Sequence, residues 1–434
     1  MRSVSIRRMG AGAVALATGA ALAACGTSGG ADVEVSEEPV TIRVTWWGSD
    51  ARAELTNEAI AAFEKEYPNI TVEGEFKDWG GYWDALATTT AANDSPDVIQ
   101  MDELYLASYG DRGTLLDLNE AADLIDTSQF DEAALATGQI DGAQYAMPIG
   151  VGVPAGVVNA DLFEEYGVEI PDDSTWTWDD YAAIAEELTE ASDGAINGSS
   201  VTGGNDVGSV KYWARLHDNE LFGEGGKVTL DPEVLASMWQ YNLDLIESGG
   251  AESAAQAVES LNAGVGAGSL ATGKIAMGFA YNTQITALKE ASGADLRLVQ
   301  LPGSGEVDAN FFKPSMYWAA SSQSDNPAEA ALFIDFMVNY EAAAEILGTE
   351  RGIPANNEMR EFVSGNLSET DALAVDYMNS VVPGTPPVVT PNGGSGVEPM
   401  IQRYTQEVYF GQSSPEDAAQ ALIDELQAEV DAAQ

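Results

Sequence analysis

The sequence predicts an α/β fold, and three features support that prediction. Strand-like runs of β-branched residues alternate with amphipathic helical segments over residues 40–101. Hydrophobic residues make up 45% of the 434 residues and aromatic residues 8%, as in a globular protein. A glycine- and proline-rich segment at 150–156 separates two strand-like runs, so we expect it to act as a hinge. The chain is long enough for two or three domain-sized cores.

Residues 1–30 have the features of a secretory signal. The segment has three arginines among its first eight residues and continues as a run of small apolar residues at 11–24. That run is too short to span a membrane, which takes about 20 apolar residues. It ends in Leu-Ala-Ala-Cys, which resembles a bacterial lipobox, so we expect residues 1–24 to be removed and Cys25 to be lipidated. An ordinary cleaved signal with an incidental cysteine is the alternative.

The segment that follows Cys25 is expected to be a tether. Residues 25–39 are rich in glycine, serine and acidic residues and offer little apolar surface to bury. Such a composition is typical of a flexible linker. No later segment has the length and hydrophobicity of a membrane span, so we expect the lipid alone to attach the protein to the cell membrane.

The chain is strongly acidic, with 70 acidic residues against 18 basic ones and a formal net charge of −52. A charge of this size repels nucleic acid and anionic lipid, which excludes DNA and RNA as expected partners. The acidic residues are spread along predicted helices rather than gathered in a tail, which indicates a solvated surface.

The elements after the tether alternate between strand and helix. Strand, helix, strand, helix and strand are predicted at 40–47, 51–67, 70–76, 82–92 and 97–101. This order is typical of a parallel sheet with helices on both faces. At the other end of the chain, Ser414 caps a predicted amphipathic helix over 418–430.

Aromatic and acidic residues follow the ends of these three strands. In open α/β sheets, ligands bind beyond the carboxyl ends of the strands. A pyranose packs its C–H face on an aromatic ring while its hydroxyl groups bond to carboxylates and amides, so the mixture favours a sugar site. The candidates are Trp47, Asp50, Asp78, Trp79, Asp102 and Glu103. Four other tryptophans, by contrast, are expected to lie in the core: Trp83, Trp176, Trp178 and Trp239.

Short motifs occur in a fixed order along most of the chain. They are FExxYPxIxV at 63–72, PDV at 96–98 with LxDL at 115–118, GxxYxxP at 142–148 with VNxDLF at 158–163, TWxWDD at 175–180, GKxAM at 273–277, PxxAxxF at 327–333 and GIPA at 352–355. In content and order they resemble the family 1 extracellular solute-binding proteins, the sugar-binding components of ABC importers.

The resemblance implies a two-lobed, periplasmic-binding-protein-like fold of type II with the ligand cleft between the lobes. Lobe 1 would comprise 40–150 and 318–362, and lobe 2 would comprise 151–317 and 363–434. It also implies further ligand contacts, some of them close to the second crossover between the lobes. These residues are Asn205, Asp206, Trp213, Tyr281, Asn282, Lys313, Tyr317, Trp318 and Arg351. Arg52 opens the first predicted helix, where it would pair either with a ligand carboxylate or with an acidic residue of the protein.

Motifs that would suggest an enzyme each lack a residue or a turn that the chemistry requires. The run GSLATGKI at 268–275 is close to a P-loop, but Ile275 stands where the magnesium-binding Ser or Thr belongs. His217 is the only histidine and no nucleophile turn accompanies it. The sequence contains neither a metal-ligating cluster nor a calcium loop, so we expect no cofactor.

We therefore expect a non-enzymatic, monomeric, sugar-binding lipoprotein of an ABC importer. It would sit on the outer face of the cell membrane or in a periplasm, close on its sugar by hinge motion and deliver it to membrane permease subunits. A lipid-anchored glycoside hydrolase that uses two of the many carboxylates is the alternative. A binding module that reports sugar to a sensor is a third possibility.

Overall fold

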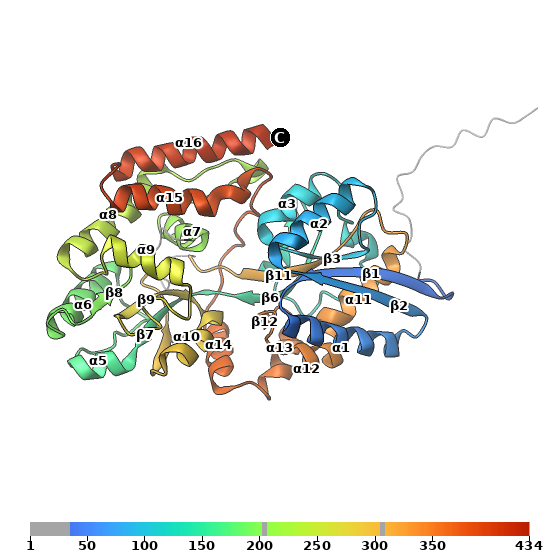
Figure 1. The fold of residues 1–434 in the computed structure, drawn as a ribbon, viewed down its shortest axis with the longest axis horizontal. Coiled ribbons are helices and arrows are strands. Elements are labelled where there is room, and N and C mark those ends of the chain that lie inside the picture. The colour runs from blue at the N-terminus through green and yellow to red at the C-terminus, as the bar shows by residue number, and fades with distance from the viewer. Residues whose placement is uncertain (1–34, 202–205, 304–308, 434) are drawn as a thin grey trace, which may run out of the picture. The chain divides into compact units, whose positions relative to one another are not determined.

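A computed structural model of the chain describes residues 35–201, 206–303 and 309–433, and its strands form two main sheets (Figure 1). The first sheet has six strands in the order β12-β6-β11-β3-β1-β2. Their bounds are β1 Val40–Trp47, β2 Ile70–Lys77, β3 Val98–Met101, β6 Met147–Gly152, β11 Lys313–Ala320 and β12 Ile353–Pro354. Strands β1, β2 and β3 are parallel, whereas β11 is antiparallel to both of its neighbours, β3 and β6. The predicted parallel sheet is therefore one half of a mixed sheet.

Helices cover this sheet and bury its apolar side chains. They are α1 Asp50–Glu66, α2 Trp79–Ala91, α3 Glu103–Gly110, α4 Glu132–Ala136, α11 Pro327–Asn339, α12 Glu341–Leu347 and α13 Asn357–Ser364, with the 3₁₀ turn η1 Leu118–Ala121 and the hairpin β4 Gln139–Ile140 and β5 Ala143–Gln144. The core contains Phe63 of α1 in edge-to-face contact with Phe333 and Phe336 of α11. Helix α2 begins three residues earlier than the pattern predicts, because the Asp78 carboxylate accepts a hydrogen bond from the Gly81 amide and caps it.

The second sheet has four strands in the order β10-β7-β9-β8, and only the pair β8 and β9 is parallel. Its strands are β7 Pro154–Asn159, β8 Asn197–Ser199, β9 Ile275–Tyr281 and β10 Leu296–Val299. The helices of this part are α5 Ala160–Tyr166, α6 Trp178–Ala191, α7 Val207–Leu216, α8 Pro232–Ser248, α9 Ala254–Ala263, α10 Ile285–Ser292, α14 Glu369–Ser380, α15 Val397–Tyr409 and α16 Pro415–Ala433, with the turns η2 Glu224–Gly226, η3 Asn282–Gln284 and η4 Gly394–Gly396.

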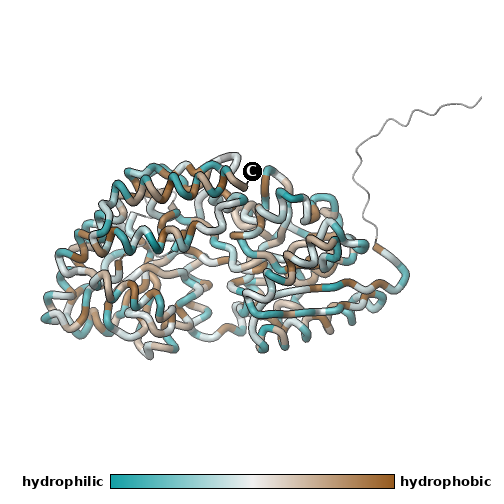
Figure 2. The backbone as a smooth tube through the Cα atoms, turned by 45° about the horizontal axis from the view of Figure 1, so that its top comes forward, coloured by the Kyte–Doolittle hydropathy of each residue, from teal (hydrophilic) through white to brown (hydrophobic). Residues whose placement is uncertain are grey.

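Polar and apolar residues alternate along these helices as their packing requires. The helix that leads to the C-terminus alternates between hydrophilic and hydrophobic stretches in Figure 2, and its buried positions include Leu422, Leu426 and Val430. Its Ser414 hydroxyl accepts a hydrogen bond from the Asp417 amide, as the predicted cap requires. Within the described ranges, no helix is long and apolar enough to cross a membrane.

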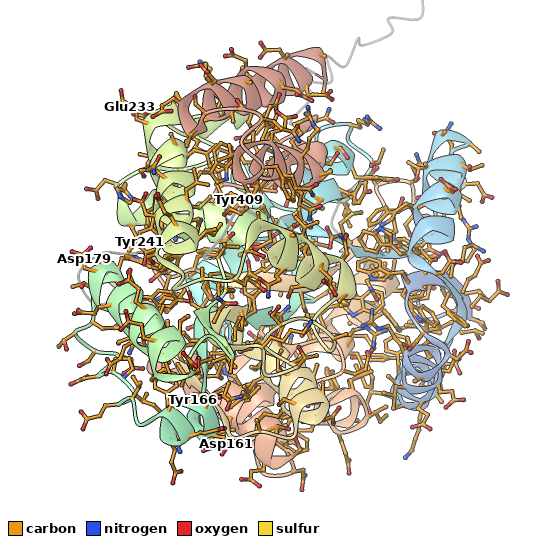
Figure 3. All side chains as sticks on the ribbon, turned by 60° about the vertical axis from the view of Figure 1, so that its left-hand side comes forward. Asp161, Tyr166, Asp179, Glu233, Tyr241 and Tyr409 are labelled. Atoms are coloured by element: carbon orange, nitrogen blue, oxygen red, sulfur yellow. The ribbon has the colours of Figure 1, made fainter. Side chains whose placement is uncertain are left out.

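Acidic side chains are common in the first turns of helices, where they face solvent. Asp161, Asp179 and Glu233 are exposed residues in the first turns of α5, α6 and α8, and Figure 3 shows them at the outer edge of the molecule. A negative charge at this end of a helix is stabilised by the helix dipole. Part of the large negative charge is thus accounted for by solvated helix ends.

The chain passes between the two sheets at the glycine- and proline-rich segment, as expected of a crossover. Strand β6 ends at Gly152 and β7 starts at Pro154 in the second sheet. The return crossover ends at Lys313, which pairs with Gly152 in the first sheet. Residues 313–317, which the sequence interpretation assigned to lobe 2, are thus the start of β11 in the first sheet, because β11 pairs with β6 from its first residue onward.

Candidate functional site

A cavity of about 460 Å³, here called the cleft cavity, lies between elements of the two sheets. Met316 and Ile353 line it from the first sheet, and the end of β9 and the helices α14 and α15 line it from the second part. Its volume lies within the range of ligand-binding pockets in proteins. Its aromatic, amide and charged lining consists of Asp206, Tyr281, Gln284, Lys313, Glu350, Arg351, Asp371 and Glu398.

Tyr281 holds a central position because it also lines two neighbouring cavities. It is the last residue of β9, and its hydroxyl donates a long hydrogen bond of 3.5 Å to Asp206, the N-cap of α7. A Cβ atom at position 208 would lie 1.6 Å from the Tyr281 hydroxyl, so only Gly208 lets the ring approach the start of α7. The Lys313 ammonium lies 5.5 Å from the ring centre, a cation–π distance.

Lys313 is surrounded by carboxylates. Burial lowers its pKa, but the negative charges of Glu103, Asp102, Asp206 and Glu398 outweigh burial and raise the pKa of Lys313 above its ordinary value. The ammonium is therefore charged at any physiological pH. Burial raises the pKa of Asp102 to about 6, while the pKa values of Asp206 and Glu398 are raised, first of all by burial.

Lys211 is a second buried cation at this site. It lies on α7 with only 5% of its surface exposed and lines a small cavity together with Glu103, Lys313 and Tyr317. Burial alone would raise the pKa of Glu103, but the charges of Lys211 and Lys313 lower it below its ordinary value. Two lysines thus face four carboxylates around Tyr281, which leaves the centre of the site with an excess of negative charge.

Trp47 and Trp79 belong to an aromatic cluster beside the site, at the ends of β1 and β2. Trp79 contacts Trp47 edge to face at 5.1 Å, and Trp83 stacks on Tyr105 with ring centres 3.9 Å apart. Trp47 is 8% exposed and Trp83 9%, so the cluster presents mainly Trp79, which is 43% exposed. Neither Trp47 nor Trp79 lines the cleft cavity. Trp83, Trp176 and Trp239 are buried, in agreement with the core assignment, and Trp178 is half-buried and packs against the core of the second sheet.

The Asn282 side chain forms its hydrogen bonds with the backbone of other segments. Although it adjoins Tyr281, it is fully buried, accepting a hydrogen bond from the Val153 amide at 2.8 Å and donating one to the Ala374 carbonyl at 2.9 Å. These bonds join the first crossover, the end of β9 and helix α14. The structure therefore places Asn282 at the first crossover, with both its amide oxygen and its amide nitrogen bonded to the protein.

Tyr317 and Arg351 are also held by protein partners. The Tyr317 hydroxyl donates to the Thr137 carbonyl at 2.9 Å, and its ring lines the small cavity beside Lys211. Arg351 is 2% exposed and donates to Thr56 at 2.6 Å, with Glu350 at 3.2 Å. Arg351 contributes to the wall of the cleft cavity, but its guanidinium group ties the segment before β12 to α1.

Trp213 and Asp50 lie outside the cleft cavity. The Trp213 indole packs against Trp178 and Tyr241 in the core of the second part and donates to Ser237 at 3.1 Å, because the apolar face of α7 turns inward there. Tyr241, labelled in Figure 3, belongs to α8. Asp50 is exposed in the first turn of α1.

The remaining predicted residues are Arg52, Asn205, Cys25, Trp318 and Lys313. Arg52 forms an ion pair with Glu350 at 2.6 Å, so of its two possible partners the structure favours the acidic residue of the protein. Asn205 and Cys25 lie outside the described residues. Trp318 is fully buried in the first core and Lys313 lies at the site.

Sequence reasoning missed Lys211, Gln284, Asp371 and Glu398. No local motif marks them, since they come from four separate helices or turns and meet only through the packing of α7, η3, α14 and α15. In the described part of the chain, no group of three or more His, Cys, Asp or Glu residues is arranged to hold a metal ion.

Known proteins resemble this chain over most of its length. Residues 58–374 match the family described as bacterial extracellular solute-binding protein. A binding protein of Brucella abortus is 24% identical over 383 residues, which is 86% of this chain and 87% of the relative. An ABC transporter extracellular-binding protein of Pyrococcus horikoshii is 28% identical over 155 residues, and the match spans 35% of each chain.

Solved structures share the fold. A family 1 extracellular solute-binding protein from Alicyclobacillus acidocaldarius matches with a TM-score of 0.76 at 25% identity, covering 91% of this chain and 99% of the other. A periplasmic oligogalacturonide-binding protein from Yersinia enterocolitica has a TM-score of 0.78 at 21% identity, with 91% and 99% covered. The GacH receptor of Streptomyces glaucescens, solved with and without acarbose, has a TM-score of 0.70 at 20% identity, with 92% and 100% covered.

These proteins have the two-lobed architecture that the two sheets and their crossovers form here. The family match covers well over half of the chain and includes the strands β6, β9, β11 and β12, which line the cleft cavity. The chain belongs to the family of bacterial extracellular solute-binding proteins, the substrate-binding proteins of ABC-type transporters.

Proposed function

We propose that this protein binds a carbohydrate in the cleft cavity and delivers it to the permease subunits of an ABC importer. The observation that carries the proposal is the cavity of about 460 Å³ between the two sheets, where the Tyr281 ring meets carboxylate, amide and ammonium groups. A sugar ring needs such a mixture, because its C–H face packs on an aromatic ring and its hydroxyl groups both donate and accept hydrogen bonds. The oligogalacturonide and acarbose proteins with the same fold support a carbohydrate as the solute.

Capture is by closure around the crossovers. A ligand that touches Met316 on the first sheet and Tyr281 on the second makes both sets of contacts only when the two halves are close, so binding shifts the population toward the closed form. Asn282, the residue after Tyr281, ties the first crossover to α14, which supports a hinge directly beside the ligand wall. The chemistry is reversible binding, and ATP hydrolysis belongs to another subunit.

We further propose that the protein works as a monomer on the outside of the cell membrane, anchored through lipid on Cys25. The lipobox-like sequence at 22–25 supports the anchor. Labelling of expressing cells with a radioactive fatty acid tests it, since Cys25→Ala should lose the label and leave the protein unanchored. Retained label in Cys25→Ala would overturn the anchor without affecting the carbohydrate site.

Carbohydrate binding is tested by thermal melting against neutral sugars, amino sugars and uronates, with mass spectrometry of each mixture. A ligand at 100 times its dissociation constant should stabilise the fold by about 2.7 kcal/mol. A carrier returns its ligand unchanged, whereas a glycoside hydrolase yields a shorter product. Stabilisation by one sugar class with intact recovery supports the proposal, and a cleaved product would replace it with hydrolysis.

A further inference from the structure

A second cavity of about 300 Å³, here called the side chamber, lies between α9 and β9. Most of its wall is apolar, and its size alone would accommodate a small group. The apolar residues that line it are Val201, Ala257, Leu261, Val265, Leu270, Ile275, Phe279, Ala280 and Leu288. Ligand sites in proteins are commonly of this kind, predominantly apolar with a few polar groups.

The side chamber adjoins the cleft cavity, because the two share part of their walls. Asp206, Tyr281 and Gln284 line both. A molecule held against Tyr281 in the cleft cavity therefore touches side chains that also form the wall of the chamber. The two spaces can be filled by two parts of one ligand.

Three polar residues of the chamber, Glu252, Ser260 and Ser269, bond to one another. The Ser269 hydroxyl donates to the Glu252 carboxylate at 2.6 Å, and the Ser269 amide donates to the Ser260 hydroxyl at 2.8 Å. Glu252 is only 3% exposed. Because these groups already satisfy each other, an apolar occupant leaves none of them without a partner, whereas a polar one would have to compete with the existing bonds.

The glycine-rich loop after α9, which leads into the run that is close to a P-loop in sequence, has a structural role here. Gly264 has a positive φ of 76°, and a Cβ atom at Gly268 would lie 2.9 Å from the Ser260 hydroxyl. The glycines let the loop after α9 fold closely over the chamber. Val265, on the same loop, lines the chamber and is 39% exposed, which puts an apolar side chain at the point where solvent reaches it.

We propose that the side chamber accepts an apolar substituent, an aryl or short alkyl group, attached to the carbohydrate in the cleft cavity. This inference rests on the proposed function and extends it from a plain sugar to a glycoside with an apolar aglycone. The sugar lies against Tyr281, and the aglycone passes that ring to contact Leu261 and Val265. Burial of an apolar ring there strengthens binding through removal of its surface from water.

The first test uses the neutral apolar dye N-phenyl-1-naphthylamine, whose fluorescence rises in an apolar site, with the purified protein. The dye should bind the wild type and the matched control Asn262→Trp, whose side chain is on the exposed face of α9. It should lose at least about tenfold in affinity in Leu261→Trp, which fills the chamber, and in Val265→Trp, which blocks it from an exposed position. Absence of dye binding to the wild type, or equal binding to all four proteins, overturns the proposal.

The second test compares phenyl and methyl glycosides of the same sugars by calorimetry. The phenyl glycoside should bind at least about tenfold more tightly in the wild type and in Asn262→Trp, and this advantage should disappear in Leu261→Trp while the methyl glycoside binds as before. Equal binding of the two glycosides in the wild type overturns the side chamber and leaves carbohydrate binding intact. Dye binding without binding of any glycoside overturns the carbohydrate assignment and leaves the apolar chamber in place.

Discussion

The Lys313 ammonium nitrogen lies 5.5 Å from the centre of the Tyr281 ring. Lys313 is the first residue of β11, where the return crossover enters the first sheet, and Tyr281 is the last residue of β9 in the second sheet. The contact therefore joins the two halves at the wall of the cleft cavity. The proposed ligand contact and the proposed hinge therefore meet at this pair.

Removal of the Tyr281 ring should weaken ligand binding. Tyr281→Ala is expected to cost at least about tenfold in affinity because the aromatic wall of the cavity is lost, whereas Tyr281→Phe keeps the ring and should cost less. Calorimetric titration measures both. Tyr166→Ala is the control, because Tyr166 is a half-buried residue of α5 that does not line the cleft cavity (Figure 3). Full affinity in Tyr281→Ala would show that the sugar binds elsewhere.

Asp102 should give the stability of the protein a distinctive dependence on pH. Burial raises its pKa to about 6, against an ordinary value of about 3.9 in the unfolded chain. The folded state thus holds this proton more tightly, and the contribution of Asp102 to the free energy of unfolding is fully present below about pH 4 and falls as pH rises to about 6.

Asp102→Asn should remove that dependence and keep the helix cap, since Asn and Asp cap helices equally well. We expect the variant to match the wild type near pH 4 and to be more stable by about 2 kcal/mol above pH 6. Urea unfolding at several pH values measures the difference. Stability curves that stay parallel across this range would contradict the raised pKa.

Asn282→Ala should destabilise the fold. The substitution leaves the Val153 amide and the Ala374 carbonyl without their partner in a fully buried place, at a cost of about 2–4 kcal/mol. Asn282→Asp keeps the acceptor for Val153 and loses the donor to Ala374. Urea unfolding reports both, and Asn262→Ala, at an exposed position of α9, serves as the control. No loss in Asn282→Ala would remove this side chain from the hinge.

The charge of the cleft should select against anionic sugars. Four carboxylates face two lysines around Tyr281, so a uronate should bind at least about tenfold more weakly than the neutral sugar of the same configuration. Glu398→Gln should reduce this difference in affinity. Glu416 is an exposed residue of α16, so Glu416→Gln should leave the difference unchanged. Calorimetric titration measures the affinity for each sugar of a pair. Tighter binding of the uronate than of the neutral sugar by the wild type would contradict an excess of negative charge at the site.

Local sequence patterns predict most of the elements. Strand β1 has the predicted bounds, 40–47, because alternating β-branched residues end at a glycine. The helix predicted at 51–67 is found at 50–66, and the glycine- and proline-rich segment forms the crossover between β6 and β7. These features depend on caps, turns and periodicity within a few residues, which the sequence displays directly.

The site is harder to predict because it depends on contacts between distant segments. Tyr281 and Asn282 are adjacent, yet Tyr281 forms part of the wall of the cleft cavity while Asn282 is bonded to the first crossover, since the chain turns into η3 at that point. Trp213 is an aromatic residue of the kind that a sugar site uses, but its side chain packs into the core beneath α7. Glu398 enters the site only because α15 folds back beside α7, and no local pattern carries that information.

The most direct test of carbohydrate binding is thermal melting of the purified protein with a panel of mono-, di- and oligosaccharides and uronates, each mixture then analysed by mass spectrometry. We expect one class of neutral or amino sugar to stabilise the protein and to be recovered intact, and we expect Tyr281→Ala to lose that stabilisation. The absence of stabilisation by every sugar in a folded sample would contradict it and direct attention to peptides, polyols or phosphodiesters as the solute.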